Sequence, residues 1–253
     1  HAEPVLSPTW TLAWWRHFGL VDGRKLRAVV VEDGEELVGL LLLSLRTVYL
    51  RRAIPVRRVE FLMTGEVEED EICSDYVGAL ALPGREEEIA HVLANVLEGD
   101  ELGPWDDLEF SAMNGEAPFV AALASVLGSR GLRPELEVTG RCPYIALPDS
   151  WEGYLASLAS AERYVVTRSL RDLEKWAGPG GYALHRAEGP ADLEKGWRIL
   201  TSLHGERWSE KGAPGVFASS RFSRFHQEVM AQLLAGTDGS LDLLWLTVHD
   251  EPI

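Results

Sequence analysis

A cluster of polar and aromatic residues late in the chain has the side-chain types that could handle an amine or an acyl group. It comprises His204, Arg207 and Trp208, and a Gly/Pro-rich segment, 212–217, follows it. A helix that ends in such side chains and runs into a glycine-containing loop places them at an opening, where they could bind an acyl donor or a polar acceptor. In the alternative interpretation, which is commoner for these residue types, Trp208 packs with Phe217 in a core and Arg207 is solvated.

Asp75 and Tyr76 form a second candidate pair at the head of an expected strand, 76–82. An aspartate can act as a general base and a tyrosine as a proton donor, and the acylation of an amine needs both roles. The alternative is structural, and residue type alone favours it: Asp75 caps the turn after the acidic run 66–71, and Tyr76 fills the edge of a sheet. The acidic run lacks the regular oxygen-ligand spacing of a calcium loop, so we expect a solvated loop and no metal site.

A basic helix face is the third candidate. The expected helix 160–176 carries its basic side chains roughly opposite an apolar face. The residues of this face are Arg168, Arg171 and Lys175, and Arg163 lies nearby. Phosphates could bind there, because guanidinium groups match phosphate oxygens. A solvated helix face is the commoner outcome for such a pattern.

Composition and absent motifs exclude several function classes. The 253 residues are 46% apolar and 25% charged, as in an ordinary soluble globular protein, and the net charge of −16 disfavours a nucleic-acid partner. Walker, GxGxxG, HExxH and nucleophile-elbow patterns are missing, so nucleotide hydrolysis, nicotinamide chemistry and zinc hydrolysis have no support. No secretory signal or membrane-spanning run is visible, and Cys73 and Cys142 do not have a metal or redox spacing. We therefore expect a cytoplasmic protein with reduced thiols.

Strands and helices alternate along the chain, which predicts an α/β organisation with mixed sheets. Two apolar runs around an acidic turn predict a hairpin at 26–45, and a second unit of this kind begins at 241–249, with a turn at 250–252 and Ile253 opening a returning strand. The repetition indicates an internal duplication whose second copy is incomplete. Residues 148–150 predict the boundary between a first domain, 1–148, and a second, 149–253.

Further elements follow from periodicity and from capping residues. Expected strands are 56–63, 76–82, 107–113 and 182–187. Expected helices are a short one capped by Thr9 or Thr11 and ended by Gly19, then 85–97, 117–127, one capped by Ser150, one capped by Ser160, 190–208 and 221–234. Residues 134–147 are expected to be extended.

Several segments, in order along the chain, resemble the CelD-like acetyltransferases of the GNAT superfamily, which are related to the Fem-type peptidyltransferases. They are the opening 7–15, the hairpin with Val38-Gly39-Leu40, Ser74-Asp75-Tyr76, residues 142–148, the basic helix, and then Leu203-His204, Arg207-Trp208, residues 215–217 and Arg221-Phe222. Each segment alone is loose, and their order over nearly the whole chain makes the resemblance persuasive. The family's basic helix is denser in arginine than residues 161–166 are here.

This resemblance implies tandem GNAT-like acyl-CoA N-acyltransferase domains, α/β (α+β) in class, with mixed, mostly antiparallel sheets. Such enzymes hold the acyl-CoA pyrophosphate at a glycine-containing turn that opens a helix, and in the second domain that turn is expected after Ile253. In the first domain the corresponding segment is 82–88, whose three consecutive glutamates suit the helix dipole but repel a pyrophosphate. The first domain is therefore expected to be degenerate, and the second to be truncated at its C-terminus.

The implied function is the transfer of an acyl group from acetyl-CoA or another acyl-CoA to an amine acceptor, possible settings being cell-envelope or polysaccharide metabolism. The candidate catalytic residues are Asp75, Tyr76 and His204, and the candidate substrate-binding residues are Arg163, Arg168, Arg207, Trp208 and Phe217. Two alternatives stay open. One is a Fem-type peptidyltransferase that uses aminoacyl-tRNA, and the other is a non-catalytic interaction module in exopolysaccharide (cellulose) assembly. The acceptor, the acyl chain and the oligomeric state are not specified by the sequence.

Overall fold

The computed structural model describes residues 4–21, 23–236 and 241–253, and the chain divides into two compact units. Unit 1 comprises His1–Glu137 and Val216–Leu233, and unit 2 comprises Val138–Gly215 and Leu234–Ile253. A late segment of the sequence thus groups with the first unit. The domain boundary expected at residues 148–150 stays a prediction.

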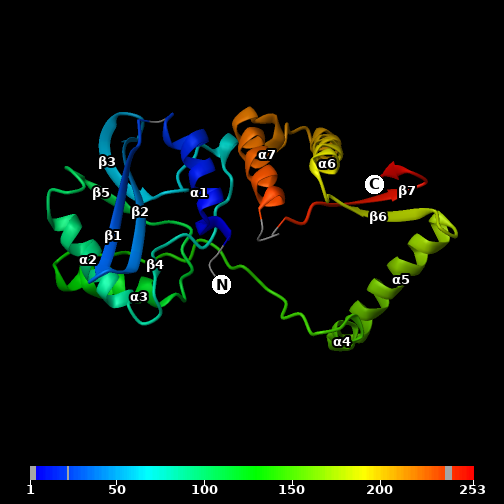
Figure 1. Cartoon of the computed structure of the whole chain (residues 1–253), viewed down its shortest axis with the longest axis horizontal. Helices are drawn as coiled ribbons and strands as arrows, with labels where there is room; N and C mark the ends of the chain where they lie inside the picture. The colour runs from blue at the N-terminus through cyan, green and yellow to red at the C-terminus, as the bar shows by residue number, and fades with distance from the viewer. Residues whose placement is uncertain (1–3, 22, 237–240) are drawn as a thin grey trace. The chain divides into compact units, whose positions relative to one another are not determined.

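Unit 1 is built on a mixed sheet (Figure 1). Strands β1 (Lys25–Asp33), β2 (Glu36–Leu50) and β3 (Ile54–Phe61) form an antiparallel meander, and β5 (Asp107–Glu109) pairs in parallel with β3. The hairpin and the strand expected at 26–45 and 56–63 are therefore confirmed. Gly34 closes the first turn with a φ of 66°, which a glycine adopts without strain.

Two expected strands are much shorter than the alternation of their residues predicted. Only β4 (Leu80–Ala81) forms from 76–82, and only β5 forms from 107–113. Tyr76 and Ala112 adopt left-handed φ values of 60° and 57°, which no regular strand contains. The two segments are instead joined by a bond from the Val77 amide to the Ala112 carbonyl, 3.1 Å.

Four α-helices accompany this sheet. They are α1 (Pro8–Trp14), which continues as a π-helix at Trp15–Gly19, α2 (Glu86–Glu98), α3 (Pro118–Ser129) and most of α7 (Ser220–Ala235). Ser7, rather than the expected Thr9 or Thr11, caps α1, because its hydroxyl accepts a hydrogen bond from the Trp10 amide. Three short 3-10 helices lie at Pro4–Leu6, Glu68–Asp70 and Val216–Ala218.

The core of unit 1 joins the sheet to these helices. Fully buried side chains come from the sheet, from α2, from α1 and from α7, and include Leu41, Phe61, Ile89, Trp14 and Phe225. Gly39 permits the close approach of α2, since a Cβ there would lie 2.1 Å from Ile89 Cδ1. Helix α7, more than two hundred residues after α1 in sequence, is thus part of the first hydrophobic core.

Unit 2 contains an antiparallel sheet of β6 (Tyr182–Arg186), β7 (Leu244–Val248) and β8 (Glu251–Pro252). Its helices are α4 (Trp151–Ser157), α5 (Ser160–Ala177) and α6 (Pro190–Glu210). Ser150 caps α4 as expected, whereas Ala159 rather than Ser160 is the N-cap of α5. Helix α6 packs closely on β7 at Gly196, where a Cβ would lie 3.1 Å from Trp245 Cζ3.

The expected final hairpin is present, but its turn lies one residue earlier. His249 and Asp250 have φ values of 52° and 66°, the left-handed pair that a tight two-residue hairpin turn requires. Strand β8 then pairs with β7, and the Ile253 amide donates to the Leu246 carbonyl, 3.1 Å. Residues 134–147 contain no regular secondary structure.

Candidate functional site

The last two turns of α6 in unit 2 present His204 and Trp208 side by side. Their ring centroids are 5.8 Å apart with planes inclined by 38°. Gly215 lies against both rings, because a Cβ built on it would be 2.5 Å from His204 Cε1 and 3.1 Å from Trp208 Cδ1. His204 and Trp208 are therefore close to each other and to the glycine-containing loop; their roles in binding or catalysis stay predictions.

The loop that follows is fixed to the end of this helix through its backbone. The Ala213 amide donates to the Trp208 carbonyl, 3.0 Å, and Gly212 adopts a φ of 71° to reverse the chain. The Lys211 ammonium lies 5.1 Å from the Trp208 ring centroid, a cation–π contact. Arg207 is exposed at the same helix end. Aromatic, imidazole and cationic groups thus gather within one helical turn and one short loop.

Phe217 belongs to unit 1, unlike the other members of the late cluster. It packs edge-on against Phe222 at 5.5 Å between ring centroids, next to the core of unit 1. Its surroundings are those of a packing residue, and its assignment to substrate binding stays a prediction.

The basic face of α5 is exposed, and its arginines bind their own helix or the residues just before it. Arg168 forms an ion pair with Asp172 at 3.3 Å, and Arg163 donates to the Leu158 carbonyl at 3.1 Å. The Arg171 side chain donates to the Thr167 carbonyl at 3.2 Å. These contacts are typical of a solvated helix face and leave phosphate binding there without geometric support.

Asp75 and Tyr76 lie in unit 1, on a short loop with unusual backbone geometry. Cys73 and Tyr76 have φ values of 51° and 60°, so two of four consecutive residues are left-handed without being glycine. Such strain persists only where surrounding contacts hold it. One contact is a hydrogen bond from Trp10 Nε1 to Ser74 Oγ, 3.2 Å, and both candidate side chains are exposed beside it.

The neighbouring acidic run, residues 66–71, was expected to be a solvated loop, but it is bound to helix α7. Asp70 accepts hydrogen bonds from Ser219 and from Arg221, at the start of that helix. Glu66 accepts one from the Trp14 indole. Two carboxylates of residues 66–71 therefore bind structural partners, and the run fastens the loop of Asp75 to the core.

An aromatic cluster surrounds Trp10, whose indole also binds Ser74 in the loop of Asp75. Trp10 packs edge-on against Phe225 at 5.0 Å and against His226 at 6.1 Å, and His226 stacks on Phe222 at 4.1 Å. Sequence reasoning missed the pairing of Trp10 with His226, since 216 positions separate them. The sequence showed only that both segments are rich in aromatic residues, and this does not indicate that they pack against each other.

Several titratable groups around this loop are perturbed. Burial raises the pKa of Glu66, and the hydrogen bond from Trp14 only partly offsets that effect. Burial also raises the pKa of the Cys73 thiol, together with the nearby carboxylates, so this cysteine is not activated as a nucleophile. Burial lowers the pKa of His226, whose Nδ1 bonds to the Phe222 carbonyl at 3.0 Å.

The N-terminus of α2 does not fit a pyrophosphate. Gly84 has a φ of 84°, as a turn before a helix requires, but Glu86, Glu87 and Glu88 all lie in the first helical turn. The nearest cation, Arg85, is already bound to Glu88 and Asp33. Negative charge at this position would repel phosphate groups. The degenerate first domain stays a prediction.

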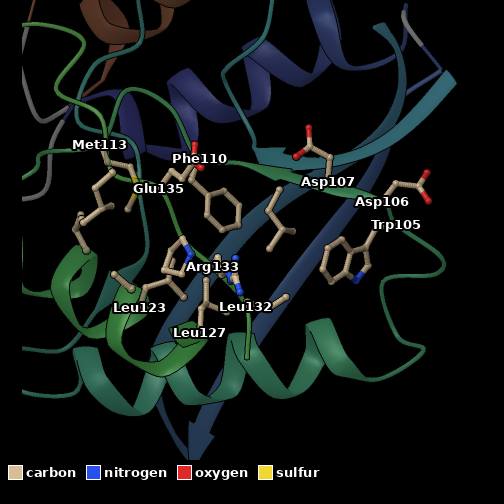
Figure 2. A pocket seen from close by; sticks show the side chains of 15 residues that line it. Trp105, Asp106, Asp107, Phe110, Met113, Leu123, Leu127, Leu132, Arg133 and Glu135 are labelled. Carbon is tan, nitrogen blue, oxygen red and sulfur yellow. The ribbon is translucent and has the colours of Figure 1, made fainter. Parts of the chain in front are cut away.

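A separate cavity of about 490 Å³ lies in unit 1, outside all the candidate clusters (Figure 2). Its walls come from β5, from α3 and from the extended segment that follows α3. Its lining is mostly apolar and includes Phe110, Leu123, Leu127 and Leu132, with Arg133 among them. None of the sequence-predicted site residues contributes to it.

Comparison with known families bears on unit 2 and on α7. Residues 160–253 match the family model of an acetyltransferase (GNAT) domain. The matched range begins with α5 and ends with the β7–β8 hairpin, and it includes the cluster at the end of α6. GNAT domains generally use acetyl-CoA or another acyl-CoA, and the match supports an N-acyltransferase in general terms.

No curated protein and no solved structure matches the chain. Within the described residues, the helices are all too short or too polar to cross a lipid bilayer.

Proposed function

We propose that the protein is a GNAT-type N-acyltransferase that transfers an acyl group from acyl-CoA to an amine. The observation that carries the proposal is the match of residues 160–253 to an acetyltransferase (GNAT) domain. The fold agrees with it in class, since a mixed sheet in unit 1 and an antiparallel sheet in unit 2 are each accompanied by helices. Tandem GNAT-like domains and the CelD-like and Fem-type relationships are part of the proposal.

The reaction forms one amide bond and breaks one thioester bond. The amine nitrogen attacks the thioester carbon, the sulfur leaves as coenzyme A thiol, and the amine loses one proton. Enzymes of this kind need a group that accepts the amine proton and donors that stabilise the developing oxyanion, rather than a covalent intermediate. Exposed polar side chains beside fixed aromatic rings suit the acceptor side of such a reaction.

Two groups of residues are proposed for that side. In unit 2, His204 would accept or relay the amine proton, while Trp208 and Arg207 would bind the acceptor; the fixed ring pair supports this assignment. In unit 1, Asp75 and Tyr76 would serve as base and acid on a strained loop that α7 and Trp10 hold in place. Proposed roles for Arg163, Arg168 and Phe217 in substrate binding have weaker geometric support.

The turn that opens α2 would not bind the acyl-CoA pyrophosphate, because the first turn of that helix is acidic. The pyrophosphate turn expected after Ile253 stays a prediction. A setting in cell-envelope or polysaccharide metabolism and a cytoplasmic location are proposed on the resemblance alone.

Release of coenzyme A thiol tests the reaction directly. The chain, and the natural polypeptide wherever it extends beyond Ile253, would be incubated with acetyl-CoA and a panel of amines while free thiol is measured. Amine-dependent thiol release above the rate without protein supports the proposal. Thermal stabilisation by acetyl-CoA provides a second readout that requires no acceptor.

The two rival functions give different results. A Fem-type enzyme would bind aminoacyl-tRNA at low salt and lose that binding as salt rises, although a net charge of −16 opposes it. A non-catalytic module would show neither thiol release nor any stabilisation by saturating acetyl-CoA. Either outcome would replace the proposed activity.

A further inference from the structure

The cavity in unit 1 has the size and the lining of a small-molecule site. Its volume of about 490 Å³ falls within the usual range for ligand pockets, roughly 300–1,000 Å³. Helix α3 supplies Leu123 and Leu127, both nearly fully buried, and the region of β5 supplies Leu108 and Phe110. A continuous apolar wall of this kind suits a hydrocarbon chain better than a polar metabolite.

One cation lies among these apolar groups. Figure 2 shows the Arg133 side chain between Phe110 and Leu127, reaching from the segment that follows α3. Within the described part of the chain, Arg133 has no hydrogen-bond or ion-pair partner. A guanidinium can bind a carboxylate through two parallel hydrogen bonds, and the apolar wall beside Arg133 would hold the hydrocarbon chain of the same ligand.

Two of the three acidic residues in the wall are already neutralised. Asp106 binds Arg57 through both of its oxygens, at 2.8 and 2.6 Å, and Asp107 binds Arg58 at 2.7 Å. The guanidinium of Arg57 lowers the pKa of Asp106, so that pair stays ionised and satisfied. Glu135 is the third acid, two residues after Arg133 in the exposed segment.

We propose that this cavity binds an amphipathic anion, namely an unbranched acyl chain that ends in a carboxylate. The chain lies along Leu123, Leu127 and Phe110, and the carboxylate pairs with Arg133. The site is distinct from the proposed acyl-transfer residues, because none of Asp75, Tyr76, His204, Arg207 and Trp208 lines the cavity. A free fatty acid and an acyl group that carries a terminal carboxylate share this chemistry.

Calorimetric titration with dodecanoate below its micellar concentration tests the site in the whole chain. We expect saturable binding near one ligand per chain, stronger for dodecanoate than for octanoate because the longer chain buries more apolar surface. Arg133→Gln should weaken dodecanoate binding about tenfold, while dodecanol binding changes little. Glu135→Gln should leave dodecanoate binding unchanged or tighten it, because it removes a nearby negative charge.

Controls separate the site from general charge effects and from misfolding. Arg52→Gln removes an exposed arginine at the turn between β2 and β3, outside the cavity, and should leave binding unchanged. Ala124→Phe fills the cavity from α3 and should abolish binding, with circular dichroism showing that the helix content is retained. Arg133 is exposed, so its substitution tests the charge even if the filling variant does not fold.

Four outcomes would overturn the proposal. They are the absence of saturable binding, equal binding by the wild type and Arg133→Gln, equal weakening by Arg52→Gln, and tighter binding of dodecyltrimethylammonium than of dodecanoate. The last result would show that Glu135 rather than Arg133 sets the charge preference. The two sources of the anion are distinguished by comparing dodecanoate with the monomethyl ester of dodecanedioate, whose carboxylate ends a chain that is esterified at its other end. The dimethyl ester, which has no carboxylate, should not bind.

Discussion

Arg221, in the first turn of α7, binds the carboxylate of Asp70, 151 positions earlier in the sequence. This ion pair is partly shielded, since the Asp70 side chain is 13% exposed and that of Arg221 is 31% exposed. Ser219 donates to the other oxygen of the same carboxylate. The acidic run is therefore a docking point for a helix that arrives late in the chain, and the loop with Asp75 and Tyr76 follows directly from it.

Removing this pairing should loosen α7 from unit 1. We expect Arg221→Gln to lower the free energy of unfolding by about 1–3 kcal/mol, because it leaves a mostly buried carboxylate with only one partner. A double-mutant cycle with Asp70→Asn, measured by denaturant unfolding, isolates the coupling between the two residues. The exposed pair Arg168–Asp172 on α5 is the matched control, with a coupling of about 0.5 kcal/mol or less. Equal coupling in the two pairs would contradict the docking role.

Gly215 should tolerate no side chain, for two separable reasons. Its φ of 71° costs about 1–2 kcal/mol for a residue with a Cβ, and that Cβ would meet the His204 ring at 2.5 Å. Gly212→Ala is the matched control, because Gly212 has the same φ but open space around it. We expect Gly215→Ala to lower the free energy of unfolding by about 1–3 kcal/mol more than Gly212→Ala does. Equal losses would show that the ring contact is not maintained in solution.

Helices, hairpins and caps could be predicted where the residues that determine them are close together in sequence. The hairpin at β1–β2 follows from two apolar runs around Asp33-Gly34, and α2 follows from apolar residues at helical spacing. Ser150 as the cap of α4 was also read correctly. In each case the residues that decide the structure lie within a few positions of one another.

The failures arose where distant contacts decide the conformation. Tyr76 looked like the start of a strand, but a left-handed backbone held by remote contacts interrupts it. Nothing local to Trp10 or His226 indicates that they face each other, because tertiary packing brings α7 to α1. The cavity lined by Arg133 was missed for the same reason, since its walls come from segments whose proximity only the fold creates.

The stability of unit 1 should fall in mild acid because of His226. Burial lowers the pKa of His226 in the folded state below its ordinary value of 6.5, so the unfolded chain binds more protons as the pH falls through 6.5. Stability contributed by the neutral imidazole is therefore complete above pH 6.5 and decreases below it. His226→Phe keeps the stacking on Phe222 and should flatten the dependence of the unfolding midpoint on pH between about 7 and 5. His91→Gln, an exposed control on α2, should leave that dependence unchanged. A wild-type midpoint that is constant over this range would refute the prediction.

Substitutions at the two proposed acceptor clusters should separate proton transfer from binding. Tyr76→Phe, Asp75→Asn and His204→Gln each remove a group that could move the amine proton, so we expect kcat to fall about 100-fold with little change in KM for the amine. Arg207→Gln and Trp208→Phe should raise KM instead, because those side chains are proposed to hold the acceptor. Tyr49→Phe is the matched control, since Tyr49 is 65% exposed on β2 and far from either cluster in sequence. The measurement is the rate of coenzyme A thiol release at varied amine concentration. If the variants of one cluster behave like Tyr49→Phe, that cluster has no part in the chemistry, and the active site must be assigned to the other.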